Sequence, residues 1–155
     1  MSKDQLDAID RKILRLLQGN GRLTNLELAE QVGLSPSPCL RRIKRLEDEG
    51  FIKHFVAVVD QDKVGLGVSV FVQIKVESQE LQALGRFETT IRRWPEVLEC
   101  YLMTGPRDYL LRVVVEDVAA YERFIKEKLT KLEGISTMES SFALSQVKYT
   151  NQLPI

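Results

Sequence analysis

Residues 33–47 constrain the fold most, because they predict a short helix with two chemically different sides. Pro38 suits the first position of a helix, and Ser37 before it suits the N-cap. Apolar residues that recur every three positions predict one buried side. They are Leu40, Ile43 and Leu46. The opposite and flanking positions hold four cations, and no acid lies between Ser37 and Leu46. The cations are Arg41, Arg42, Lys44 and Arg45.

A second short helix is predicted just before this segment. Residues 24–27 have the spacing of a capping box, and Gly33 suits the end of the helix. Its apolar residues are Leu26, Ala29 and Val32. An earlier helix, capped by Asp7 and ending at 19–21, adds further apolar residues. They are Ile9, Ile13, Leu16 and Leu17. Two short helices joined by a tight glycine turn, the second one basic, are typical of a helix-turn-helix.

A helix with an apolar back and guanidinium groups on its front fits the major groove of DNA, so we predict DNA binding. Arg41 and Arg45 are predicted to read base edges by bidentate contacts with guanine. Arg42 and Lys44 are predicted to contact phosphates. Two alternatives stay open. One is a solvated basic helix face without a role in DNA binding, and the other is an ion pair of Arg42 with Glu49 or another helix acid.

Residues near the starts of the two helices complete the predicted DNA-binding face. Ser35 and Ser37, together with the amide groups at the helix start, are expected to hold phosphates. Thr24 and Asn25 are expected to touch the DNA backbone. Cys39 is also predicted to contact DNA. It is expected in the first turn of the basic helix, where the helix dipole and the arginines would lower the pKa of its thiol. A redox switch at Cys39 is therefore a further hypothesis.

Composition limits how this DNA binding can work. The 155-residue chain has 22 basic and 22 acidic residues, which argues against a generic polycation that coats nucleic acid. One basic helix should bind weakly, so function calls for two or more copies. The sequence shows no membrane-length apolar run and no secretory leader, and its two cysteines lack metal-type spacing. We expect a cytoplasmic chain that uses no metal and no cofactor.

The sequence after Gly50 changes from helical to strand periodicity. Residues 51–59 predict a strand, and a flexible joint follows at 65–67. We therefore expect three regions. They are a helix-turn-helix DNA-binding domain over 1–52, a linking strand and hinge over 53–67, and an effector-binding and oligomerisation domain over 68–155.

Alternating strand and helix patterns fill the last of these regions. They predict a strand over 68–76, a helix over 80–93, strands over 97–104 and 109–115, a helix over 117–132 and a strand over 135–147. This order is the ferredoxin-like βαββαβ arrangement, so the chain as a whole is predicted to be α+β. Apolar residues occupy both faces of several strands, and a second copy of the domain would cover the face that the helices leave open.

A set of short motifs spread over the chain carries a family resemblance. In the first domain they are Leu6-Asp7, Ile9-Asp10, Asn20-Gly21-Arg22, Leu34-Ser35, Cys39, Arg42-Ile43, Leu46-Glu47 and Gly50-Phe51-Ile52. In the second they are Gly105, Asp108-Tyr109-Leu110-Leu111 and Asp117. With these motifs the chain resembles the Lrp/AsnC family of bacterial and archaeal transcription regulators, also called feast/famine regulatory proteins.

The resemblance implies an architecture and a ligand. It implies an N-terminal winged helix-turn-helix domain, a linking strand and a ferredoxin-like effector (RAM) domain that pairs into homodimers, often four dimers in an octamer. Family members commonly sense an amino acid at the interface between effector domains. The segments 140–144, 148–150 and 153–155 are similar to a subgroup that responds to apolar or sulfur-containing amino acids. Leucine, methionine or a similar amino acid is therefore the expected effector.

The turn at residues 105–108 is the candidate effector site. Asp108 is expected to accept the ammonium of a zwitterionic amino acid, while turn amides and Arg107 take its carboxylate. Gly105 would allow close backbone approach, and Ser140 or Ser141 would complete the pocket. The family usually has an acid or another polar residue at position 106 and often an aromatic one at 107, whereas this chain has Pro106 and Arg107. The alternative is an ordinary hairpin whose aspartate closes the turn.

These observations predict a sequence-specific transcriptional regulator of amino-acid metabolism that is not an enzyme. Two rivals come from other classes. Siroheme decarboxylases resemble the same two-domain fold and use histidines, whereas this chain has only His54. A nucleoid-type architectural protein would wrap DNA without an effector and with little sequence discrimination.

Overall fold

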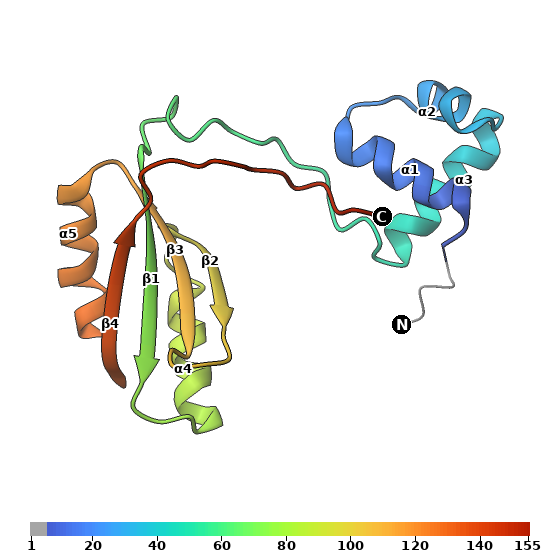
Figure 1. The fold of residues 1–155 in the computed structure, drawn as a ribbon. Coiled ribbons are helices and arrows are strands. Elements are labelled where there is room, and N and C mark those ends of the chain that lie inside the picture. Colours follow the sequence, from blue (N-terminus) through green and yellow to red (C-terminus); the bar gives the residue numbers. More distant parts are fainter. Residues whose placement is uncertain (1–5) are drawn as a thin grey trace. The chain divides into compact units, whose positions relative to one another are not determined.

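The computed structural model describes residues 6–155, which divide into two compact units (Figure 1). The first unit comprises the described residues through Val58 together with the tail Lys148–Ile155, and the second is Val59–Val147. The tail therefore differs from the sequence prediction, which placed it in the effector domain over 68–155. The first five residues of the domain predicted over 1–52 lie outside the described residues.

The first unit is built from helices α1 (Ala8–Gly19), α2 (Asn25–Val32) and α3 (Pro36–Asp48). Asp7 caps α1 through a capping box with Asp10, and Thr24 caps α2 in the same way. Gly33 ends α2 at a φ of 76°, a left-handed conformation that favours glycine. These caps confirm the predicted helix starts and the predicted turn.

The start of α3 corrects one prediction. Ser35 occupies the N-cap and Pro36 comes directly after it, where we predicted Ser37 and Pro38 for these two positions. The helix begins earlier because Pro36 also fits the first helical position, where a backbone N–H would have no intrahelical acceptor. Pro38 is tolerated inside the first turn for the same reason.

The three helices share one apolar core. Its buried residues are Ile13, Leu14, Leu28, Ala29, Val32, Cys39 and Leu46. Two leucines predicted for this core are instead exposed, Leu26 at 66% and Leu40 at 43%. Leu28 takes the inner position on α2, because burial there follows residues 28, 29 and 32. On α3 it follows Cys39 and Leu46, so Leu40 lies toward solvent.

The segment predicted as a strand over 51–59 is not one. Residues 51–67 contain no strand, and residues 53–59 are exposed although Phe55, Val56, Val58 and Val59 are strand-forming residues. A strand needs a hydrogen-bonding neighbour, and no described segment of this chain pairs with the linker. The tail contacts the first unit instead. The main-chain N–H of Leu153 donates to Gln18 Oε1 at 2.6 Å, and Arg15 Nη1 donates to the main-chain oxygen of Ile155 at 2.9 Å.

The second unit is a four-stranded antiparallel sheet in the order β2-β3-β1-β4, with its helices on one face (Figure 1). Its elements are β1 (Val68–Val76), α4 (Leu81–Ile91), β2 (Val97–Leu102), β3 (Tyr109–Val115), α5 (Val118–Glu127), the short 3-10 helix η2 (Leu129–Lys131) and β4 (Ile135–Phe142). This βαββαβ topology confirms the predicted ferredoxin-like domain and the α+β class.

Four elements of the second unit are shorter than predicted. α4 spans Leu81–Ile91 where 80–93 was predicted, and β2 ends at Leu102 where 104 was predicted. β4 ends at Phe142, not at Val147, because its partner β1 begins at Val68 and the last pairing bond runs from the N–H of Ala143 to the oxygen of Ser69. α5 ends at Glu127, and η2 fills most of the remaining predicted helix. Among the described residues, no helix is both long and apolar enough to cross a membrane.

Candidate DNA-binding face and effector turn

The exposed residues of α3 include Pro36 at its start and Glu47 and Asp48 at its end. Between these ends the exposed side holds Ser37, Leu40, Arg41 and Lys44. Their spacings of three and four residues put them on one helix face, as the period of an α-helix requires. Arg41 and Lys44 are therefore exposed, as predicted, but they share this side with Leu40, which was predicted for the buried side. Leu40 was missed as a surface residue, because its three-residue spacing from Ile43 and Leu46 resembled a buried stripe. A short apolar side chain next to an arginine suits contact with a thymine methyl group.

Arg42 and Arg45 on α3 form ion pairs with acids at the start of α1. Arg42 Nη1 lies 2.6 Å from Asp7 Oδ2 and 2.8 Å from Asp10 Oδ1. Arg45 forms an ion pair with the other carboxylate oxygen of Asp10. The ion pair that we left open as the alternative for Arg42 is thus present, with the N-cap Asp7 and with Asp10 of α1 and not with Glu49. The predicted orientation of Arg45, almost opposite the buried side, is wrong, because the side chain reaches α1.

This ion-pair cluster alters the acid–base behaviour of its members. Hydrogen bonds to Asp7 and then Asp10 raise the pKa of Arg42, and the hydrogen bond to Asp10 raises the pKa of Arg45. The backbone N–H of Asp10 and then the guanidinium of Arg42 lower the pKa of Asp7 below its usual 3.8. All three shifts favour the charged forms in the folded unit.

The lowered pKa of Asp7 predicts a loss of stability in acid. A depressed folded-state pKa stabilises the fold above the unfolded value, and this contribution is lost as the pH falls below about 4. The urea midpoint of the first unit should therefore fall between about pH 5 and about pH 3. The Asp7→Asn variant, which has no carboxyl to titrate there, should show a smaller fall. If the urea midpoint falls equally with pH in both proteins, the lowered pKa of Asp7 is not a source of acid sensitivity.

Cys39 cannot have the role predicted for it. Its side chain is 0% exposed in the core of the first unit. Burial raises the pKa of its thiol, and the charge of Arg42 offsets this only in part. The predicted contact with DNA and the low-pKa redox switch are both wrong, because the first turn of α3 points this side chain inward.

At the starts of α2 and α3, the side chains of Thr24 and Asn25 form hydrogen bonds within the first unit, whereas Ser35 and Ser37 are exposed. Thr24 Oγ1 donates to Glu27 Oε2 at 2.8 Å within the capping box. Asn25 Nδ2 donates to the main-chain oxygen of Pro36 at 2.8 Å and so fastens the start of α2 to that of α3. Ser35 and Ser37 are exposed, and the hydroxyl of Ser35 makes no capping hydrogen bond. The two serines are thus exposed, whereas Asn25 is engaged inside the motif.

The effector turn differs from its prediction at Asp108. This side chain is 7% exposed, and both of its oxygens have protein donors. The N–H of Val76 donates to Oδ2 at 2.8 Å, and Gln79 Nε2 donates to Oδ1 at 2.9 Å. Asp108 therefore fastens the hairpin to the end of β1, which is close to the alternative of a structural aspartate. The predicted acceptor for a ligand ammonium is already occupied.

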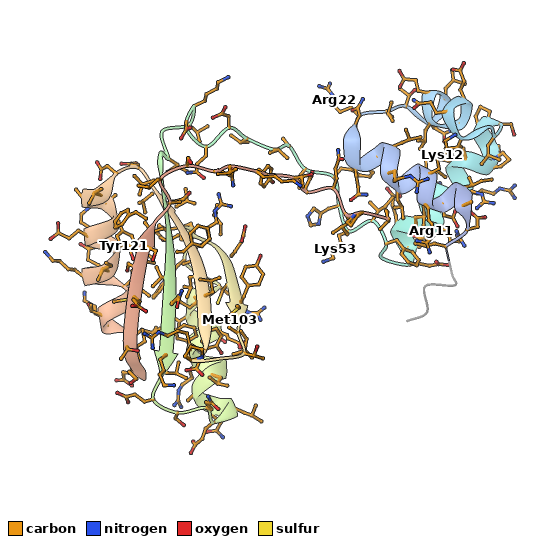
Figure 2. All side chains as sticks on the ribbon, viewed as in Figure 1. Arg11, Lys12, Arg22, Lys53, Met103 and Tyr121 are labelled. Atoms are coloured by element: carbon orange, nitrogen blue, oxygen red, sulfur yellow. The ribbon has the colours of Figure 1, made fainter. Side chains whose placement is uncertain are left out.

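The other predicted effector residues do not form one cluster. Gly105 adopts a φ of 117°, which favours glycine, and an added Cβ would meet nothing within 4 Å in the described chain, so its predicted close approach is not to another segment of the same chain. Arg107 pairs with Glu139 at 2.9 Å. The hydroxyl of Ser140 lies 2.6 Å from that of Tyr121 on α5, whose ring Figure 2 labels. Ser141 is exposed and, as the next residue of β4, points to the opposite sheet face.

A helix-turn-helix unit joined to a βαββαβ domain is typical of two-domain transcription regulators with a ligand-binding domain. Residues 6–53 match the family model for a winged helix-turn-helix DNA-binding domain, and residues 69–153 match the model for the Lrp/AsnC ligand binding domain. The chain belongs to the Lrp/AsnC family, and it is a DNA-binding transcriptional regulator of that type.

Named relatives extend over nearly the whole chain. The DNA-binding transcriptional activator DecR of Escherichia coli is 45% identical over 97% of this chain and 99% of that protein. The Bkd operon transcriptional regulator of Pseudomonas aeruginosa is 44% identical, with the same coverage. A transcriptional regulator of Neisseria meningitidis, solved in complex with L-Met, is 44% identical, covers 96% of each chain and superimposes with a TM-score of 0.91.

Proposed function

We propose that this chain regulates genes of amino-acid metabolism by sequence-specific binding to duplex DNA, and that it catalyses no reaction. The observation that carries the proposal is the exposed side of α3, where Leu40, Arg41 and Lys44 stand on a helix fastened from behind. An anchored helix with a mixed polar and apolar front fits the major groove. Binding to the genome also implies a cytoplasmic location.

Each residue of this side has a distinct proposed contact. Arg41 is the base reader, bidentate to guanine, and Leu40 contacts a thymine methyl group. Lys44, Ser35 and Ser37 hold phosphates on either side. Arg45 is no longer proposed as a base reader, because Asp10 already engages its guanidinium. The proposed readout thus rests on fewer cations than the sequence suggested.

The second unit supplies assembly and sensing. We propose homodimers, assembled into an octamer, whose effector is a small apolar amino acid such as methionine or leucine. Support comes from the L-Met complex of the Neisseria regulator and from apolar side chains on the sheet face opposite the helices, including Phe71. Such a ligand changes assembly or DNA binding only if its affinity differs between the two states.

Selection of duplexes from a random pool tests the DNA-binding proposal. We expect a preferred, roughly palindromic site, because two recognition helices related by a two-fold axis read two half-sites. Uniform recovery of all sequences would favour the architectural alternative.

Calorimetry and size exclusion with L-Met, L-Leu and the other common amino acids test the effector. No heat with any of them would refute sensing, and a siroheme spectrum that changes on incubation would revive the enzyme alternative.

A further inference from the structure

The buried carboxylate of Asp10 has no role in the readout described above. It lies on α1 and is 1% exposed, although charged side chains are almost never buried without a partner. Its two oxygens are shared between Arg42 and Arg45, on consecutive turns of α3. Its own backbone N–H donates to Asp7 Oδ1 at 2.8 Å, which places the second acid beside Arg42.

The charges of this cluster cancel. Two carboxylates of the α1 start face two guanidiniums of α3, so half of the cations on that helix are neutralised within the unit. Arg41 and Lys44 are exposed on the other side of α3, and no ion pair of theirs is found in residues 6–155. The cluster therefore separates the cations of α3 into an engaged pair and an available pair.

We propose that Asp10 is a positioning residue for DNA recognition, which rests on the DNA-binding function proposed above. By holding Arg42 and Arg45, it fixes the rotation of α3 about its axis and withholds two guanidiniums from phosphates. Non-specific affinity comes almost entirely from phosphate contacts, whereas discrimination comes from base edges. Asp10 thus raises the ratio of specific to non-specific binding.

The salt dependence of DNA binding measures this effect directly. In the Asp10→Asn variant, Arg42 keeps Asp7 as a partner, so one guanidinium per helix, that of Arg45, becomes available for phosphate. Each added phosphate contact steepens the logarithmic salt slope by about 0.9. Per helix, affinity for a random duplex should then fall roughly threefold more across a fourfold rise in salt. The variant should also bind random DNA more tightly at low salt and discriminate less.

Two further variants separate this proposal from a merely structural role. Glu30→Gln removes one exposed acid from the same unit and controls for net charge, so its slope should stay nearer to wild type. Asp10→Asn combined with Arg45→Gln should return the slope to the wild-type value. An Asp10→Asn slope equal to wild type, or a double variant that stays steep, would overturn the proposal.

Arg45→Gln alone keeps the test valid if Asp10→Asn does not fold, because Arg42 still pairs with Asp10 in that variant. Its slope should equal that of the wild type, and a shallower slope would show that Arg45 already contacts phosphate. Different results would refute the proposed function and the role of Asp10. A wild-type protein that ignores duplex DNA at low salt refutes the proposed function, whereas normal binding with the wrong variant slopes refutes only the role of Asp10.

Discussion

Truncating Leu46 to alanine is expected to destabilise the first unit by about 2–5 kcal/mol, the range for removing a fully buried leucine from a core. Leu46 is 0% exposed and packs on the inner side of α3 with Ile13 and Leu28. Urea unfolding followed by circular dichroism would measure the loss. DNA binding should be lost together with the fold of this unit, because the recognition helix depends on its core.

Leu40→Ala is the matched control on the same helix. This side chain is 43% exposed, so its truncation should change stability by less than about 0.5 kcal/mol. It should nevertheless weaken binding to a selected site that contains thymine at the contacted position. If the two leucines cost the same stability, the assignment of inner and outer sides of α3 is wrong.

Arg41→Ala is expected to cost about 1–3 kcal/mol of specific binding free energy, so the dissociation constant should increase roughly 5–150-fold. The physical reason is the loss of a bidentate guanidinium contact with guanine from the exposed side of α3. Titration of a selected duplex by fluorescence anisotropy would measure it. The same titration with a duplex that carries another base at the contacted position should show a much smaller difference.

Lys44→Ala provides the comparison for a phosphate contact. It removes one cation from the same exposed side, so it should weaken selected and random duplexes alike and lower the salt slope by about one. Equal behaviour of the Arg41 and Lys44 variants on both duplexes would contradict the division into a base reader and a phosphate contact.

Much of the fold follows from local sequence patterns. Residues 24–27 form the predicted capping box, and the strand–helix order of 68–147 predicted a βαββαβ sheet that the structure confirms. Local patterns suffice here because caps and amphipathic periods act within a few residues. The fold errors occur where a local pattern allows more than one outcome. The strand-forming residues of 51–59 pair with no described segment of this chain, and Pro36 and Pro38 both suit the start of a helix.

The site was harder to predict because its key contacts span distant positions. The pattern of α3 alone cannot reveal that Arg42 and Arg45 meet Asp10, which is 32 and 35 residues earlier. The signal that was available is an acid three residues after the capping Asp7, on a helix with an otherwise apolar inner side. Asp108 was misread for the same reason, since its partners Val76 and Gln79 precede it by 32 and 29 residues.

The tail contacts that Gln18 and Arg15 make with Leu153 and Ile155 have a practical meaning for dissecting this regulator. The first unit therefore consists of two stretches that are separate in the sequence, the described residues through Val58 and the tail Lys148–Ile155, with the whole sheet domain between them. A fragment that ends at Val58 lacks the tail Lys148–Ile155 and so lacks part of this unit. A protease that nicks the linker would break the only covalent path from the helices to the sheet, so the helices would stay attached only through their noncovalent contacts with the tail Lys148–Ile155.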